Sequence, residues 1–335
     1  MTRPYTKPPL TFDQQLAQLV VRGLVVDDRE QILRVLESTS YYRLSAYWYP
    51  FCVRDQDDNV TDLLMPGTKS SAIVTLYEFD RRLRLAIMDA TERVEIAVRT
   101  RLTYQLAHAH GAFGHLQKTN FHTEFKHTEW LASVREEAGR SKEEFIRHHQ
   151  ETYDGFPDLP IWKATEIMSL GSISILFRGL KHEDKKPVAH WFKLHHKRLA
   201  DWLHVLTYIR NVCAHHGRLW NRELAIRPSC PNSKDWCPPV TPRTDRVFII
   251  LLMLRQLLAV TSPAGEWQQR CNRLLEPMAS NPRWRESMGL PEKWREHPLW
   301  IQPIGWSRRH DRHADNGSAE RTMTEPPYPK TGPES

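Results

Sequence analysis

The sequence predicts an all-α protein, and three observations lead to this fold class. Apolar residues recur at spacings of three and four along most of the chain, as in helices with one buried face. No segment alternates polar and apolar residues between hairpin turns, which is the pattern of half-buried strands. The composition, 40% hydrophobic and 26% charged over 335 residues, is that of a globular protein with one large domain or two smaller ones.

The N-terminal third predicts two short helices and one long helix. Thr11 to Asp13 can cap a first helix that Gly23 ends, and a second helix fits residues 28–37. The aromatic segment 40–51 follows, either as core between two helices or as a stacking platform for bases. A polar loop is then expected over 54–68, before a helix over 71–110.

The 71–110 helix has a predicted inner and a predicted outer face. On the outer face, Glu95 and Arg99 are four residues apart and can form a supporting ion pair. The other outward positions include Arg81, Arg82 and Arg84. The inner face is expected to bury Ile73, Leu76, Leu83, Ile87, Ala90, Val94, Ala97 and Leu102.

The rest of the chain continues the helical pattern. A Pro-rich loop is expected over 226–243, and the residues beyond 301 have few apolar side chains and are expected to be disordered. The predicted helices cover residues 124–153, a segment that opens at 159–162 and breaks near Gly171, and residues 185–193, 196–220, 244–261 and 265–280. The expected organisation is an N-terminal helical segment (1–70), a core (71–262), C-terminal helices (263–301) and a tail (302–335).

The sequence gives no sign of a membrane segment, a signal peptide or a metal site. The longest apolar run, 247–254, is far shorter than the roughly 20 residues that span a bilayer. The N-terminus lacks an apolar signal core, so a cytoplasmic location with reduced cysteines is expected if the source is bacterial. The five cysteines contain no Cys-x2-Cys pair, so we expect buried thiols and neither a metal nor another cofactor.

The charge is concentrated in one part of the chain. The net charge is +7, and residues 178–227 contain eleven lysines and arginines against four acids, together with seven of the 17 histidines. Lysine and arginine attract phosphate, and histidine exchanges protons near neutral pH. This stretch therefore suggests that a polyanion is bound and cleaved, although charge alone is equally consistent with a solvated helix face.

The segment 202–222 carries the residues with chemical potential. Its apolar stripe predicts a helix with one buried face, from which Arg210, Asn211 and His215 project. Asn211 and His215 share a face, whereas Arg210 and His215 point about 140° apart on a regular helix. They can converge if the helix ends between them, or if two copies meet about a two-fold axis and share the site.

Several blocks of the sequence resemble a known family. Arg210 to His215 matches the Arg-x4-6-His motif of HEPN-fold ribonucleases, and the longer run from Arg210 to Arg222 is similar to the Abi family of bacterial abortive-infection proteins, the Abi-D/Abi-F group. The other blocks with this resemblance, in chain order, are residues 7–12, 40–50, 77–84, 92–95 and 160–166.

The resemblance implies an all-α, HEPN-type helical bundle with additional N-terminal and C-terminal helices. It implies a homodimeric toxin that cleaves RNA without a metal during phage defence, and some members are associated with a small non-coding RNA that restrains them. Arg210, Asn211 and His215 are the catalytic candidates, and His216 fits the same motif with one more residue of spacing.

The residue types agree with this chemistry. Cleavage without a metal needs a proton-transfer group, which His215 supplies, and a cation for the phosphate charge, which Arg210 supplies. Asn211 can orient His215, whereas Arg218 and Arg222 either contact flanking phosphates or fix the helix end. Further RNA contacts are expected from Lys193, Lys197 and Arg198. The alternative function is an RNA-binding scaffold that holds a small structured RNA with little or no cleavage.

Overall fold

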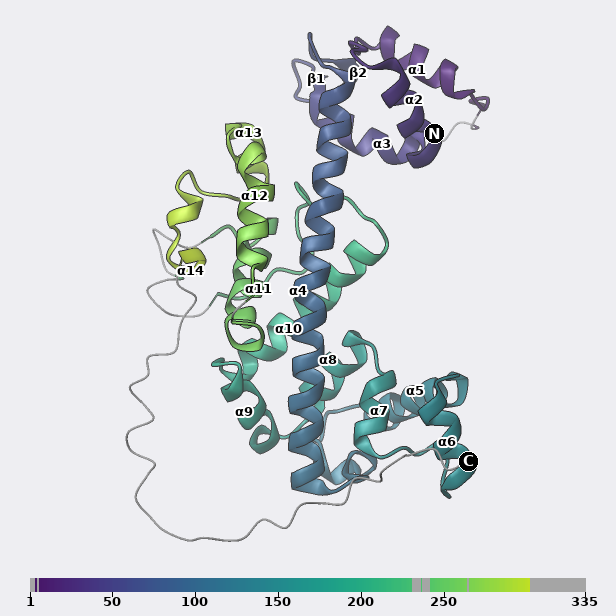
Figure 1. Cartoon of the computed structure of the whole chain (residues 1–335), viewed down its shortest axis with the longest axis vertical. Coiled ribbons are helices and arrows are strands. Elements are labelled where there is room, and N and C mark those ends of the chain that lie inside the picture. Colours follow the sequence, from purple (N-terminus) through teal and green to yellow (C-terminus); the bar gives the residue numbers. More distant parts are fainter. Residues whose placement is uncertain (1–3, 5, 231–235, 237–241, 264, 302–335) are drawn as a thin grey trace, which may run out of the picture. The chain divides into compact units, whose positions relative to one another are not determined.

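Helices dominate the computed structural model, which describes residues 4, 6–230, 236, 242–263 and 265–301 (Figure 1). The predicted all-α class is therefore confirmed. The tail predicted from 302 to 335 and much of the predicted 226–243 loop lie outside the described residues. Among the described helices, none combines the length and apolar content needed to cross a bilayer.

The N-terminal region contains the two predicted helices and a third. Thr11 caps the first helix together with Gln14 in a reciprocal capping box. Tyr47 and Trp48 of the aromatic segment are buried, whereas the side chain of Tyr42 is 89% exposed. The C-terminal half of this segment therefore contributes most of its packing in the core. The helices are α1 (Phe12–Val21), α2 (Arg29–Thr39) and α3 (Tyr41–Trp48), followed by the 3₁₀ turn η1 (Tyr49–Phe51).

A small antiparallel hairpin occupies part of the predicted 54–68 loop, so that prediction was wrong in part. Strand β1 (Cys52–Arg54) pairs with β2 (Val60–Leu64), with Cys52 opposite Leu64. Both strands are too short to show a clear alternation, and their side chains are mostly exposed or half-buried. The hairpin was therefore invisible to a search for polar and apolar periodicity.

Helix α4 (Ser70–His110) is the scaffold of the fold. Its 41 residues extend over about 60 Å, and it contacts α2, α3 and α7 through α12 along its length (Figure 1). The predicted inner face is buried except at Ala97, which is half-buried. Arg84 was predicted to face outward but is only 6% exposed, because it pairs with buried Asp80 one turn earlier.

The predicted 124–153 helix is two helices, α5 (His127–Arg140) and α6 (Glu144–Thr152), so this prediction was wrong. The chain turns at Ser141, whose side-chain oxygen accepts a hydrogen bond from the Glu143 amide at 3.3 Å. The next break falls at Met168 and Ser169, between α7 (Ile161–Ile167) and α8 (Leu170–Gly179), close to the predicted Gly171. Ser169 caps α8 by accepting from the Ser172 amide at 3.2 Å.

The remaining helices form the core and its cover. Helix α11 is apolar on all sides, and most of its residues are buried against α4 and its neighbours. The helices are α9 (His182–Trp191), α10 (His196–Ala214), α11 (Val247–Thr261), α12 (Trp267–Ala279), α13 (Pro282–Ser287) and α14 (Pro298–Ile301), and the 3₁₀ turns are η2 (Gly114–Leu116), η3 (Lys118–Asn120) and η5 (Trp294–Glu296).

Buried His115 predicts a loss of stability in mild acid. It is 1% exposed, and its burial lowers the pKa to about 4 from 6.5. Between these two pH values the unfolded chain binds a proton that the folded chain does not, so the free energy of unfolding falls as the pH falls from 6.5 to 4. The shift corresponds to about 3 kcal/mol. Urea unfolding at several pH values checks this, and His115→Leu should have a flatter pH profile. An identical profile for the variant would contradict the assignment.

Candidate functional site

Helix α10 ends at Ala214, six residues before the predicted end at Trp220. His215 caps the helix, and the chain then reverses through His216, whose φ is +56°. The amides of His216 and Gly217 donate to the carbonyls of Cys213 and Val212, at 3.0 and 2.8 Å. These two bonds form a Schellman motif, in which the left-handed residue is histidine instead of the usual glycine.

The helix end does not by itself bring Arg210 and His215 together in one chain. His215 retains near-helical dihedrals, φ −84° and ψ 12°, and its amide donates to the Asn211 carbonyl at 2.9 Å. Its side chain therefore stays on a different side of α10 from Arg210. Arg210 instead donates to the side-chain oxygen of Asn211 at 3.4 Å. Within the described part of the chain, no hydrogen bond joins Arg210 to His215.

Asp80 of α4 fixes the turn that follows α10, residues 215–220. Its fully buried carboxylate accepts hydrogen bonds from the amides of Leu219 and Trp220, at 3.1 and 2.7 Å, and from the Tyr47 hydroxyl at 2.7 Å. Arg84 forms an ion pair with the same carboxylate. Burial raises the pKa of Asp80, and Arg84, Tyr47 and the two amides act in the opposite direction. We call Asp80, Tyr47 and Arg84 the Asp80 cluster.

Hydrogen bonds between arginine side chains and main-chain carbonyls also hold the same turn. Arg43 of α3 donates to the His216 carbonyl at 2.8 Å, and Arg84 lies 3.5 Å from the Gly217 carbonyl. Arg218 reaches back to the Ala46 carbonyl at 2.7 Å, and Arg222 donates to the Arg218 carbonyl at 2.8 Å. Arg218 and Arg222 are half-buried in these contacts, as the alternative of a fixed helix end expected.

The sequence reasoning missed the roles of Asp80, Tyr47 and Arg43. All three lie inside the blocks 40–50 and 77–84 that carry the family resemblance. The structure brings these two blocks into contact with the turn of the third block, 210–222. The resemblance of these separate blocks to one family could therefore have indicated that their side chains meet in space.

A basic cavity of about 530 Å³ opens beside the turn. Arg43, Arg81, Arg84 and His216 line it, and none of its lining residues is acidic. We call it the arginine pocket. Ala214 also lines it, one turn beyond Arg210 on the same face of α10, whereas His215 is not among its lining residues. The exposed side chains of His215 and His216 thus differ in their surroundings.

The other predicted RNA contacts lie at the opposite end of α10. Lys193 and Lys197 are exposed and Arg198 is half-buried, all at the turn between α9 and α10. Residues 197 and 215 are about 27 Å apart along the helix axis. The basic stretch is therefore divided between the two ends of α10 instead of being gathered around His215.

Glu95 and Arg99 form the predicted ion pair, at 3.0 Å, but away from the turn. Arg99 also donates to the Met168 carbonyl at 3.0 Å, which ties α4 to the break between α7 and α8. Arg84 and Arg99 are separated by about 22 Å along α4. The pair supports the scaffold and does not contact the catalytic candidates.

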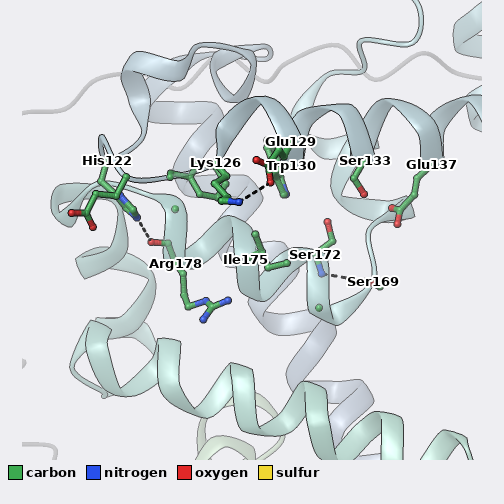
Figure 2. A pocket seen from close by; sticks show the side chains of 14 residues that line it. His122, Lys126, Glu129, Trp130, Ser133, Glu137, Ser169, Ser172, Ile175 and Arg178 are labelled. Carbon is green, nitrogen blue, oxygen red and sulfur yellow. Dashed lines mark hydrogen bonds and ion pairs between the residues drawn. The ribbon is translucent and has the colours of Figure 1, made fainter.

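A larger cavity, about 760 Å³, lies between α5 and α8 (Figure 2). Figure 2 shows Ser133 and Glu137 of α5 opposite Ser172 and Ile175 of α8. Both acidic and basic side chains line this cavity, and Lys126 pairs with Glu129 at 3.3 Å. Because its charges are mixed and partly paired, it fits a polyanion less well than the arginine pocket does.

The described residues contain no cluster of three or more side chains that could hold a metal ion. Cys213 and Cys271 are buried free thiols, as expected, and burial raises the pKa of each to about 12. Cys52 and Cys230 are half-buried, and Cys237 lies outside the described residues.

Comparison with known proteins identifies a family. The model of a family described as Abi-like protein matches residues 34–221, more than half of the chain. The match includes the Asp80 cluster and the α10 turn. Searches of curated proteins and of solved structures found no match.

Proposed function

Because this chain belongs to the Abi-like protein family, which links it to abortive infection, we propose that it is a metal-independent endoribonuclease of bacterial phage defence. The observation that carries the proposal is the exposed turn with His215 and His216 beside an arginine-lined, acid-free pocket. Proton-transfer groups next to phosphate-binding cations are what RNA cleavage without a metal requires. We place the enzyme in the cytoplasm, where its RNA substrate is found, and assign its core to the HEPN type and its sequence to the Abi-D/Abi-F group.

In the proposed reaction, the ribose 2′-oxygen attacks the adjacent phosphorus. A neutral His215 imidazole accepts the proton of the 2′-hydroxyl, and a protonated His215 imidazole donates a proton to the leaving 5′-oxygen. Arg210 stabilises the negative charge that develops on the phosphate. Asn211 holds the Arg210 guanidinium through its side-chain oxygen. The bond to the 5′-oxygen breaks, and the products are a 2′,3′-cyclic phosphate and a 5′-hydroxyl end.

We propose that the active enzyme is a homodimer. Arg210 and His215 lie on different sides of α10 in one chain, so one chain does not direct both groups at a single phosphate. Two α10 ends that meet about a two-fold axis would let each site combine groups from both copies. Light scattering that shows a monomer with RNA bound would contradict this arrangement.

The second candidate function is an RNA-binding scaffold. The location of Lys193, Lys197 and Arg198 at the far end of α10 favours it, because these cations can hold RNA without touching the histidines. A small structured non-coding RNA that restrains the enzyme would use the same contacts. If cleavage is detected, one protein can have both functions. If it is not, only the scaffold function remains.

Cleavage of labelled RNA in EDTA tests the proposal. The wild-type chain should cleave, whereas Arg210→Ala should lose roughly 10²-fold or more in rate, as for removal of one charge-stabilising donor. Arg147→Ala serves as the matched control, because the Arg147 side chain is exposed on α6, and should keep the wild-type rate. Wild-type activity that disappears in EDTA would overturn the metal-independent mechanism. Binding without cleavage would leave the scaffold function instead.

A further inference from the structure

We propose that the arginine pocket binds one nucleotide of the RNA, with its phosphate on Arg43 and Arg81 and its base on the apolar wall. This inference rests on the proposed function, since it assigns a subsite for the same RNA. The ligand class is a nucleoside 3′-monophosphate unit that flanks the cleavage site, so Arg43 and Arg81 hold a flanking phosphate and Arg210 acts on the reacting one. The cavity volume, about 530 Å³, is in the range of small-ligand sites.

The charges of the pocket favour an anion. The Arg84 charge is balanced by Asp80, but Arg43 forms no ion pair with an acid among the described residues. Arg81 has only a loose contact with Glu78, at 3.6 Å, and both side chains are about half exposed. Two guanidinium groups therefore remain to bind phosphate oxygens, for which their planar shape is well suited.

The apolar wall of the pocket is suited to a base. Tyr77, Leu85 and Met88 of α4 line it, next to the arginines of the same helix. Leu85 is 57% exposed, and the Tyr77 ring is fixed edge-on against Tyr47, with centroids 5.2 Å apart. A flat base can cover Leu85 and contact the aromatic ring, as bases do in proteins that bind single-stranded RNA.

The conformation of the turn relates this pocket to the catalytic groups. The reversal at His216 makes that side chain part of the pocket lining, and His215 is outside it. We assign nucleotide binding to His216 and proton transfer to His215. Arg43 links the pocket to the turn, since it lines the pocket and also binds the His216 carbonyl.

Binding of adenosine 3′-monophosphate to the full chain tests this site without requiring cleavage. Arg81→Ala should weaken binding by roughly 10- to 100-fold, as for a lost charged hydrogen bond. Arg82→Ala is the matched control, because Arg82 is exposed on the next position of α4 and does not line the pocket. Titration calorimetry at low salt measures both, and the control should match the wild type.

Three results would overturn the inference: no binding of the nucleotide at millimolar concentration, equal binding by Arg81→Ala, or equal affinity for inorganic phosphate. The last would show that the apolar wall has no role. In RNA cleavage, Arg81→Ala should raise KM with little change in kcat. Nucleotide binding by a chain that never cleaves RNA would contradict the proposed function but support the site.

Discussion

Replacing His215 by alanine is expected to slow RNA cleavage by roughly 10²- to 10⁴-fold, the usual contribution of a proton-transfer group. The imidazole of His215 is exposed, and no hydrogen bond from this side chain to another described residue is found. Its removal should therefore leave the fold and the RNA affinity intact. Single-turnover cleavage in EDTA measures the rate, and thermal unfolding of the same sample measures stability.

Two other histidine variants make this result specific. His204→Ala, at an exposed position of α10, should cleave at the wild-type rate. His216→Ala should mainly weaken substrate binding, because His216 lines the arginine pocket. A large loss of kcat in His216→Ala together with normal cleavage by His215→Ala would transfer the catalytic role to His216.

Asp80→Ala is expected to lower the free energy of unfolding by about 3–5 kcal/mol, the effect of breaking a buried ion pair from one side. The substitution leaves Arg84, which is 6% exposed, without its carboxylate. It also leaves the amides of Leu219 and Trp220 without their acceptor. Urea unfolding followed by circular dichroism measures the change.

Two milder variants separate the parts of the Asp80 cluster. Asp80→Asn keeps one acceptor oxygen for the amides but removes the charge beside Arg84, so its loss should be smaller than that of alanine. Tyr47→Phe removes the hydrogen bond that the hydroxyl donates to Asp80 and the one, at 3.3 Å, that it accepts from Arg84, and should cost about 1–2 kcal/mol. A loss below 1 kcal/mol for Asp80→Ala would mean that the turn is held by other contacts.

Periodicity predicted the elements whose burial is regular. The helix expected over 71–110 is α4, Ser70–His110, because its apolar residues recur once per turn and face a continuous core. The β1–β2 hairpin and the break at Ser141 were not predictable in this way. Both occur in polar segments, where a short turn and a few local hydrogen bonds decide the conformation.

The end of α10 depends on residues distant in the sequence. The pattern predicted a helix to Trp220, and Leu219 and Trp220 are indeed buried. Their burial follows instead from the Asp80 carboxylate, about 140 residues earlier in the chain, which binds their amides. Arg84 was assigned to the outer face for a similar reason, since its charge suggested solvent and its partner Asp80 was not recognised.

The turn after α10 is held through its main chain. Its carbonyls at His216 and Gly217 accept from Arg43 and Arg84, and its amides at Leu219 and Trp220 bind Asp80. No described contact of this set uses the imidazole of His215 or His216. The chemical group at position 215 can therefore be exchanged without rebuilding the loop, and variants there report changes in reactivity at a constant backbone. At position 216 the left-handed conformation, φ +56°, adds backbone strain for most replacements.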